Sequence, residues 1–88
     1  MSARRFTPPR AVDVTADRAG RPCTLVWRGR AERVVAVEAT WEEAEGWWRG
    51  PGAATARCCH RVRTTTGLRC LLYHNLTSNN WSLGAILD

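Results

Sequence analysis

The stretch from residue 57 to 74 constrains the fold more than any other, because two alternating segments there flank a short glycine-bearing turn. Successive side chains of a strand point to opposite faces. A three-residue loop, Thr65-Thr66-Gly67, with glycine in the left-handed third position, pairs Val62 with Cys70. A two-residue turn would instead set Arg63 against Cys70, so the longer loop predicts a hairpin with one apolar and one arginine-rich face. The other predicted partners are Thr64 with Leu68, His60 with Leu72 and Cys58 with His74.

Other strand and turn signals surround this hairpin. Expected strands cover residues 12–15, 22–27 and 81–87, each bounded by connections that contain Gly, Pro or Asn. Together with the hairpin and one further segment they make five to six short strands in a row, which is typical of an antiparallel meander rolled into a small open barrel. We therefore predict an all-β fold, with residues 1–10 as an irregular tail and residues 11–88 as a single small β domain.

The segment from residue 31 to 45 supports two interpretations. Between Val34 and Trp41 apolar residues recur at helical spacing, and the alanines and glutamates favour a helix. The β-branched valines favour a strand. We predict a strand over residues 32–40 and a short helical turn at 41–45, and a continuous helix over 31–45 stays open as the alternative.

Five tryptophans in 88 residues must supply much of so thin a core. Trp27, Trp41 and Trp81 fall on the apolar faces of the expected strands, and burying an aromatic side chain contributes roughly 1.5–3 kcal/mol. Trp47 and Trp48 are adjacent, and neighbouring residues of an extended chain cannot both face one core. We expect one of these two rings to line an interaction groove.

The order of these motifs resembles a known family. The matching residues extend from Val12 to Asp88 and are Trp27-Arg28-Gly29-Arg30, Val34, Val37, Trp41, Trp47-Trp48, Arg61-Val62-Arg63-Thr64 before Gly67, Leu72-Tyr73, Trp81-Ser82-Leu83 and Asp88. The set is similar to a family of small uncharacterised bacterial domains, largely actinobacterial, that occur alone or fused to Y-family translesion-polymerase-like proteins. The resemblance implies a DNA-repair or mutasome neighbourhood, and it implies no established activity.

Arginine dominates the charge of the chain. All 13 basic residues are arginine, and the net charge is +5. Residues 1–30 carry seven arginines against two aspartates, whereas residues 31–50 carry five glutamates against two arginines. The arginine excess reflects either codon bias in a high-GC genome, as the abundant alanine suggests, or selection for bidentate contacts to phosphate. In the second case the uneven charge would orient the domain on a polyanion.

The candidate nucleic-acid-binding residues follow from the hairpin register. Arginines of its first strand share one face, Arg69 falls opposite Arg63, and Tyr73 lies on the same face, where its ring is placed to stack on a base. The Arg-Gly-Arg turn offers two more guanidinium groups for phosphate contact. A solvated strand face and an ordinary hairpin turn are the alternatives. The full set of candidates is Arg28, Arg30, Arg57, Arg61, Arg63, Arg69 and Tyr73.

Cysteine and histidine suggest a second kind of site. Cys58, His60 and His74 share a face in the predicted register, so three side chains that can bind zinc converge there. A structural zinc site needs a fourth ligand, and the sequence has no Cys-x-x-Cys pair. We therefore expect no metal or other cofactor, with a structural zinc domain kept as an alternative. Cys59 points away from His60 in a strand, so we expect no catalytic cysteine and no enzyme activity.

No segment has the pattern of a signal peptide or the length of an apolar membrane span, so we expect a cytoplasmic location with reduced thiols. The sequence predicts a non-enzymatic binding module that contacts nucleic acid, with DNA or a translesion-polymerase-like protein as partner. The alternative is a protein-interaction adaptor that uses Trp47 and Trp48 with the acidic residues Glu42, Glu43 and Glu45. No small-molecule substrate is indicated.

Overall fold

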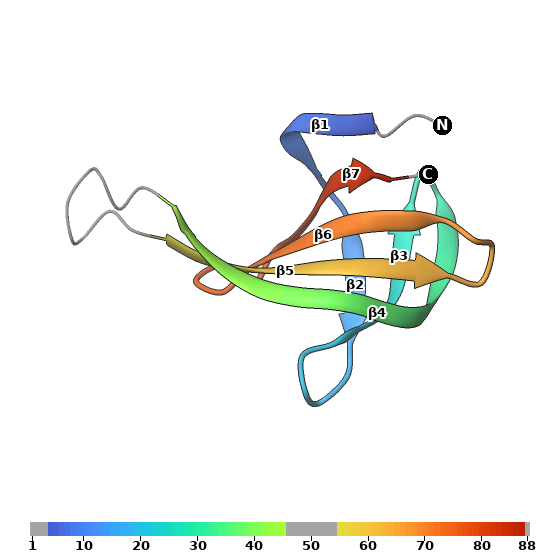
Figure 1. Cartoon of the computed structure of the whole chain (residues 1–88), viewed down its shortest axis with the longest axis horizontal. Coiled ribbons are helices and arrows are strands. Elements are labelled where there is room, and N and C mark those ends of the chain that lie inside the picture. The colour runs from blue at the N-terminus through green and yellow to red at the C-terminus, as the bar shows by residue number, and fades with distance from the viewer. Residues whose placement is uncertain (1–3, 46–54, 88) are drawn as a thin grey trace.

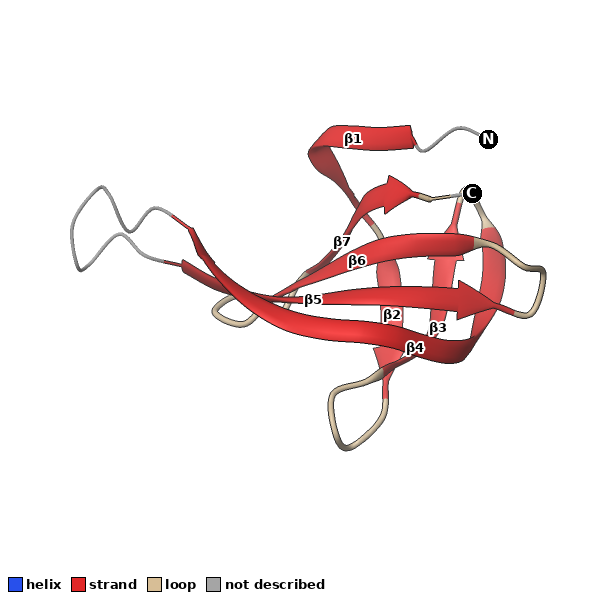
Figure 2. Cartoon of the chain, in the orientation of Figure 1, coloured by secondary structure: helices blue, strands red, loops and turns tan. Residues whose placement is uncertain are grey.

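The computed structural model describes residues 4–45 and 55–87, and every regular element within these ranges is a β-strand. The strands are β1 (Arg4–Ala11), β2 (Asp13–Ala16), β3 (Pro22–Trp27), β4 (Arg30–Glu45), β5 (Thr55–Thr64), β6 (Arg69–Asn75) and β7 (Trp81–Ile86). They pair antiparallel in one curled sheet (Figure 1, Figure 2). The all-β class is confirmed, with seven described strands where five to six are predicted. No helix in these ranges could cross a membrane.

The order of the strands explains why the sheet curls. That order is β1-β7-β6-β5-β4-β3-β2, so the first two strands of the chain occupy opposite ends of the sheet. Only Val12 separates β1 from β2, and its backbone N–H donates to the carbonyl oxygen of Trp81 at 3.2 Å. One short stretch of chain therefore pairs first with β7 and then with β3, which draws the two ends of the sheet together into a half-barrel (Figure 1).

β5 and β6 pair in the register that the turn predicts. Val62 is the Cα partner of Cys70, and Gly67 has a φ of 87°, which glycine adopts without steric cost. As this register requires, Val62 is buried while Arg61 and Arg63 are exposed. The predicted pairs His60 with Leu72 and Cys58 with His74 are also Cα partners.

The concave face of the half-barrel holds the core. Side chains from β1, β3, β5, β6 and β7 meet there, and Trp27 and Trp81 pack against them while staying partly exposed. Each fully buried large side chain contributes roughly 1.5–3 kcal/mol, so a few of them supply most of the stability of so small a domain. The buried apolar cluster consists of Phe6, Val12, Leu25, Val62, Cys70, Leu72 and Leu83.

The N-terminal segment from residue 4 onward belongs to the sheet, so the prediction of an irregular tail is wrong for residues 4–10. Residues 4–11 form β1, which pairs with β7. The register shifts between Arg5 and Arg10, a stretch that contains two prolines without N–H donors. Phe6 is only 7% exposed. Burial of this ring is the physical reason that the segment is ordered despite its prolines and arginines.

β4 runs without interruption to Glu45, so both the helical turn at 41–45 and the continuous helix over 31–45 are wrong. Its pairing with β5 extends as far as Glu45 and Thr55. Two register shifts, within residues 34–36 and 37–39, each insert one extra residue into the strand. As a result, residues paired with the core side of β5 recur every three positions, which imitates helical spacing. These residues are Val34, Val37 and Thr40, opposite Thr64, Val62 and His60.

The bulge within residues 37–39 also turns Trp41 outward, to the face opposite that of Val37. Trp41 pairs with Cys59 on the convex face, and 39% of it is exposed. The prediction that Trp41 belongs to the core is therefore wrong, whereas Trp27 and Trp81 do pack against the core.

Candidate functional site

The convex face of β5 and β6 carries the predicted arginine row. Arg61 and Arg63 of β5 are exposed, and Arg63 is the Cα partner of Arg69 in β6. Arg57 lies further along the same face, where it contacts Tyr73. The structure thus brings together the five residues predicted for this hairpin, which we call the strand face. Like charges set across a strand pair oppose each other unless counter-charge is close by.

Glu38 supplies part of that counter-charge. It lies at the second bulge of β4, and its Oε1 accepts hydrogen bonds from Nε and Nη2 of Arg69 at 3.1 and 2.9 Å. Nε of Arg61 lies 3.7 Å from the same oxygen. The hydrogen bond from Arg69 holds the pKa of Glu38 below its ordinary value, against partial desolvation and with help from the nearby arginine charges. Arg63 forms no ion pair with any side chain that the structure describes.

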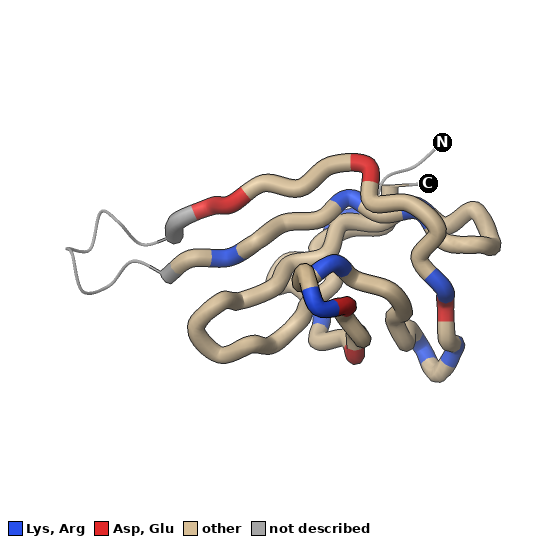
Figure 3. The backbone as a smooth tube through the Cα atoms, turned by 90° about the horizontal axis from the view of Figure 1, so that it is seen from below, with Lys and Arg blue, Asp and Glu red and all other residues tan. Residues whose placement is uncertain are grey.

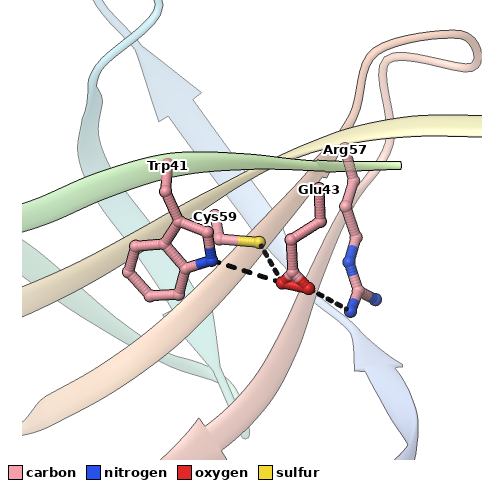
Figure 4. Close-up of polar contacts among 4 residues, drawn as sticks. All are labelled: Trp41, Glu43, Arg57 and Cys59. Carbon is pink, nitrogen blue, oxygen red and sulfur yellow. Dashed lines mark hydrogen bonds and ion pairs between the residues drawn. The ribbon is translucent and has the colours of Figure 1, made fainter. Parts of the chain in front are cut away.

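Glu43 organises a second cluster at the other end of this face (Figure 4). Its Oε1 accepts from Nη2 of Arg57 at 3.1 Å, while Oε2 accepts from the Trp41 indole N–H at 3.2 Å and from the Cys59 thiol at 3.4 Å. The hydrogen bond from Arg57 is the main reason that the pKa of Glu43 is lowered, against desolvation. Burial, reinforced by Glu43, raises the pKa of Cys59 to about 12. Cys59 is therefore a protonated hydrogen-bond donor under ordinary conditions.

Tyr73 is less open than base stacking requires. The guanidinium carbon of Arg57 lies 4.0 Å from the centroid of the Tyr73 ring, a cation–π contact that covers one face. The edge of the ring lies so close to Gly84 that a Cβ there would sit 2.3 Å from Cε2 of Tyr73. A base can therefore stack on Tyr73 only after Arg57 moves away.

The other predicted arginines lie in the turn between β3 and β4. Arg28 and Gly29 both have positive φ, 54° and 75°, and the Arg28 guanidinium carbon lies 5.2 Å from the centroid of the Trp27 ring. Arg30 begins β4 and is exposed. Trp27, Arg28 and Arg30 border a hollow of about 290 Å³.

The two histidines of the concave face contact Trp81 and neighbouring polar side chains. The His74 ring stacks on Trp81 with centroids 4.1 Å apart and planes at 4°, and its Nε2 lies 2.6 Å from Oδ1 of Asn79. Nδ1 of His60 lies 3.1 Å from the Thr40 hydroxyl oxygen. Burial, with a smaller contribution from His74, lowers the pKa of His60, so its imidazole is neutral near pH 7.

Cys58 and His74 are Cα partners, with His60 on the same face, as the register predicts. Even so, no three potential ligands among the described Cys, His, Asp and Glu residues are grouped as a metal site requires. All four cysteines are free thiols. The predicted groove residues Trp47 and Trp48 lie outside the described residues.

Sequence reasoning missed four participants in these surfaces. Glu38 and Glu43 form the ion pairs of the strand face. Arg4 and Arg10 of β1 lie over the Phe6 ring, at 5.4 and 5.5 Å from its centroid. Alternation of acidic and basic residues across β4 and β5 would have revealed the glutamates only if the bulges were known. Figure 3 shows these acidic and basic positions side by side on the two strands.

Comparison with known proteins identifies the family of the chain. The model of the family described as Domain of unknown function (DUF6504) matches residues 2–88, so the chain belongs to this family. The match includes β1, in agreement with its place in the sheet. Neither a curated protein nor a solved structure matches the chain.

Proposed function

We propose that this member of the DUF6504 family is a non-enzymatic, cytoplasmic binding module that contacts nucleic acid through its arginines. The main support for this proposal is that Arg63 and Arg69 face each other directly, while one described carboxylate, Glu38, pairs with both Arg69 and Arg61. Positive charge therefore exceeds negative charge on this part of the strand face. A phosphate seated across the arginines would turn their mutual repulsion into attraction.

The proposed contact set comprises the strand face and the turn between β3 and β4. Arginine suits both places, because its guanidinium group binds a phosphate through two parallel hydrogen bonds. The resemblance to domains attached to translesion-polymerase-like proteins supports a DNA-repair setting, in which the module would lie beside DNA or beside such a polymerase.

The chemistry of the concave and convex faces supports a binding role over catalysis. Cys59 donates to Glu43 and its pKa is far above neutrality, so it is not a thiolate nucleophile. The pKa of Cys58 is also raised, by burial and by the Glu42 charge. A nucleophilic thiol needs the opposite environment, with a lowered pKa and a base within hydrogen-bond reach.

Salt-dependent binding tests this proposal. Fluorescence anisotropy of labelled single-stranded and duplex DNA should give an affinity that falls with salt, with a slope of log K against log salt of about −0.7 to −0.9 per phosphate bound. Arg61→Glu with Arg63→Glu should abolish binding while the circular dichroism spectrum stays unchanged, since both side chains are exposed. Arg18→Glu with Arg21→Glu, an equal charge reversal at two exposed positions between β2 and β3, is the matched control. The proposal fails if the parent protein does not bind at low salt, or if the control loses affinity as strongly.

Exposure of Trp41 favours a second candidate, a protein-interaction adaptor. Its ring lies on the convex face of the β4–β5 ribbon, which extends beyond the rest of the sheet (Figure 1). Glu43 lies beside it on the same face, and its carboxylate accepts a hydrogen bond from the indole N–H. Exposed aromatic rings are enriched at protein interfaces. Titration of a purified translesion-polymerase-like protein with the parent and with Trp41→Ser tests this function, and equal affinities would exclude Trp41 from it.

A further inference from the structure

The end of the half-barrel formed by β1 and the β3–β4 turn gathers a second group of arginines (Figure 1). The guanidinium carbons of Arg4 and Arg10 lie 5.4 and 5.5 Å from the centroid of the Phe6 ring. That of Arg28 lies 5.2 Å from the Trp27 ring, and Arg30 borders the same hollow as Arg28. We call Arg4, Arg10, Arg28 and Arg30 the end cluster.

Contact between the two rings holds the end cluster together. Phe6 of β1 and Trp27 of β3 meet edge to face, with centroids 5.4 Å apart. Two guanidinium groups lie over one ring and a third lies over its neighbour, so like charges gather around the ring pair. The cation–π contacts offset only part of that repulsion at an exposed site.

The charge balance of the end cluster differs from that of the strand face. Arg57, Arg61 and Arg69 each have a glutamate within ion-pair distance. Within residues 4–45 and 55–87, no carboxylate forms an ion pair with a member of the end cluster. The nearby Glu32 directs its carboxylate inward, to the hydroxyls of Thr64 and Thr66. The end cluster therefore presents positive charge that no ion pair in the described part of the chain neutralises, and the Glu32 carboxylate acts on Arg30 only at longer range.

The backbone conformation of Arg28 is independent support for a functional role of this turn. With a φ of 54° it occupies the left-handed region, where a turn of this kind strongly prefers glycine, asparagine or aspartate. A non-glycine residue in a disfavoured backbone region costs free energy, and such residues concentrate at functional sites. Here the strained residue places a guanidinium group over Trp27 at the rim of the hollow.

We infer that the end cluster binds the phosphate groups of a nucleic-acid backbone, an inference that rests on the proposed function and names the group it recognises. Arg28 and Arg30 would hold one phosphate at the hollow beside Trp27, and Arg4 and Arg10 would hold its neighbours along the strand. Because Phe6 is buried and its ring and that of Trp27 carry guanidinium groups, these rings are not platforms for bases. Recognition is accordingly independent of base sequence.

Anisotropy of a labelled oligothymidylate and a labelled duplex tests the inference. Arg28→Asn places a residue suited to the left-handed region at the turn, so it should leave the melting temperature unchanged or raised while weakening binding roughly tenfold at low salt. Arg4→Gln with Arg10→Gln should reduce the salt slope by about 0.7 for each phosphate of the single strand that the variant no longer binds. Arg18→Gln is the control for removal of one positive charge, and it should change neither the affinity nor the salt slope.

The outcomes separate this inference from the proposed function. Loss of binding in the end-cluster variants, for both the oligothymidylate and the duplex, supports the inference. Loss of binding only in the strand-face variants overturns it while the proposed function stands, and no binding by the parent protein overturns both. Inorganic pyrophosphate is a further competitor. If it displaces DNA at micromolar concentration and binds the parent protein but not Arg28→Asn, the ligand is a free phosphate compound and the backbone assignment is wrong.

Discussion

The carboxylate of Glu32 accepts a hydrogen bond of 2.9 Å from the Thr64 hydroxyl inside the half-barrel, where only 6% of Glu32 is exposed. Thr66 donates to the same oxygen, so the β5–β6 turn supplies two donors to one buried anion. The hydrogen bonds from Thr66 and then Thr64 lower the pKa of Glu32, against the effect of burial and with help from the Arg30 charge. The charged form of Glu32 thus links β4 to the turn that sets the hairpin register.

Stability should depend on pH through this group. Because the folded pKa of Glu32 lies below its ordinary value of 4.5, its contribution is fully present above that pH and is lost as the pH falls through the folded pKa. Glu32→Gln should therefore be less stable than the parent protein at pH 7, and the difference should shrink as the pH falls below 4.5. Denaturant unfolding followed by tryptophan fluorescence measures this difference. Glu42→Gln, an exposed neighbour on β4, is the control, and a difference constant with pH would contradict the assignment.

Truncation of Phe6 should show that β1 is part of the folded core. The ring packs against Trp27 and is almost fully buried, so Phe6→Ala should cost about 3–5 kcal/mol of unfolding free energy. Phe6→Leu keeps much of the apolar volume and should cost less, so that a folded variant is available for measurement. Thr7→Ala, at an exposed position of the same strand, is the control. A loss below about 0.5 kcal/mol for Phe6→Ala, the range of surface substitutions, would show that β1 does not stabilise the fold.

The hairpin register was accessible from the sequence, because a glycine that needs positive φ and a strict two-residue alternation leave one good pairing of β5 with β6. The sequence did not predict in the same way which side chains of β4 face the core. The two bulges of β4 change which residues face the core, and a bulge depends on contacts with neighbouring strands rather than on local propensity. Trp41 was assigned to the wrong face for this reason.

The candidate site was predictable to a similar extent. The shared face of Arg61, Arg63 and Arg69 followed from register alone. Its partial neutralisation by Glu38 did not, since Glu38 reaches this face from a bulge. The end cluster did not follow from register either, because Phe6 and Trp27 lie on β1 and β3 and meet only when the sheet curls.

Gly84 should be required for the position of Tyr73. A Cβ at residue 84 would lie 2.3 Å from Cε2 of Tyr73, so the ring must move, and with it the Arg57 side chain that stacks on it. Gly84→Ala should cost about 1–3 kcal/mol, as overpacking substitutions do. In a Tyr73→Ala background the same substitution should cost much less, and a double-mutant cycle measures the coupling. Additive costs for residues 73 and 84 would refute the contact.

The four thiols should react in an order set by their surroundings. Burial raises the pKa of Cys59 to about 12 and that of Cys70 to about 11, and both side chains are inaccessible. Iodoacetamide near pH 8 should therefore modify the partly exposed Cys23 first and Cys58 more slowly, since burial and Glu42 raise the pKa of Cys58. Cys59 and Cys70 should react only when local or global opening of the fold exposes them, and all four thiols should react in denaturant. Peptide mass spectrometry over time gives the four rates.

Two glutamate variants make this order a test of the Glu43 cluster. The Glu43 carboxylate accepts a hydrogen bond from the Cys59 thiol and raises the pKa of that thiol. Glu43→Gln removes this carboxylate, so it should speed modification of Cys59 and leave the rate at Cys58 unchanged. Glu42→Gln should do the reverse, because the Glu42 charge acts on Cys58. The two substitutions change charge and size equally at adjacent positions, so each is the control for the other. Equal acceleration of both cysteines by either variant would point to general loosening of the β4–β5 ribbon and would contradict the specific bond from Cys59 to Glu43.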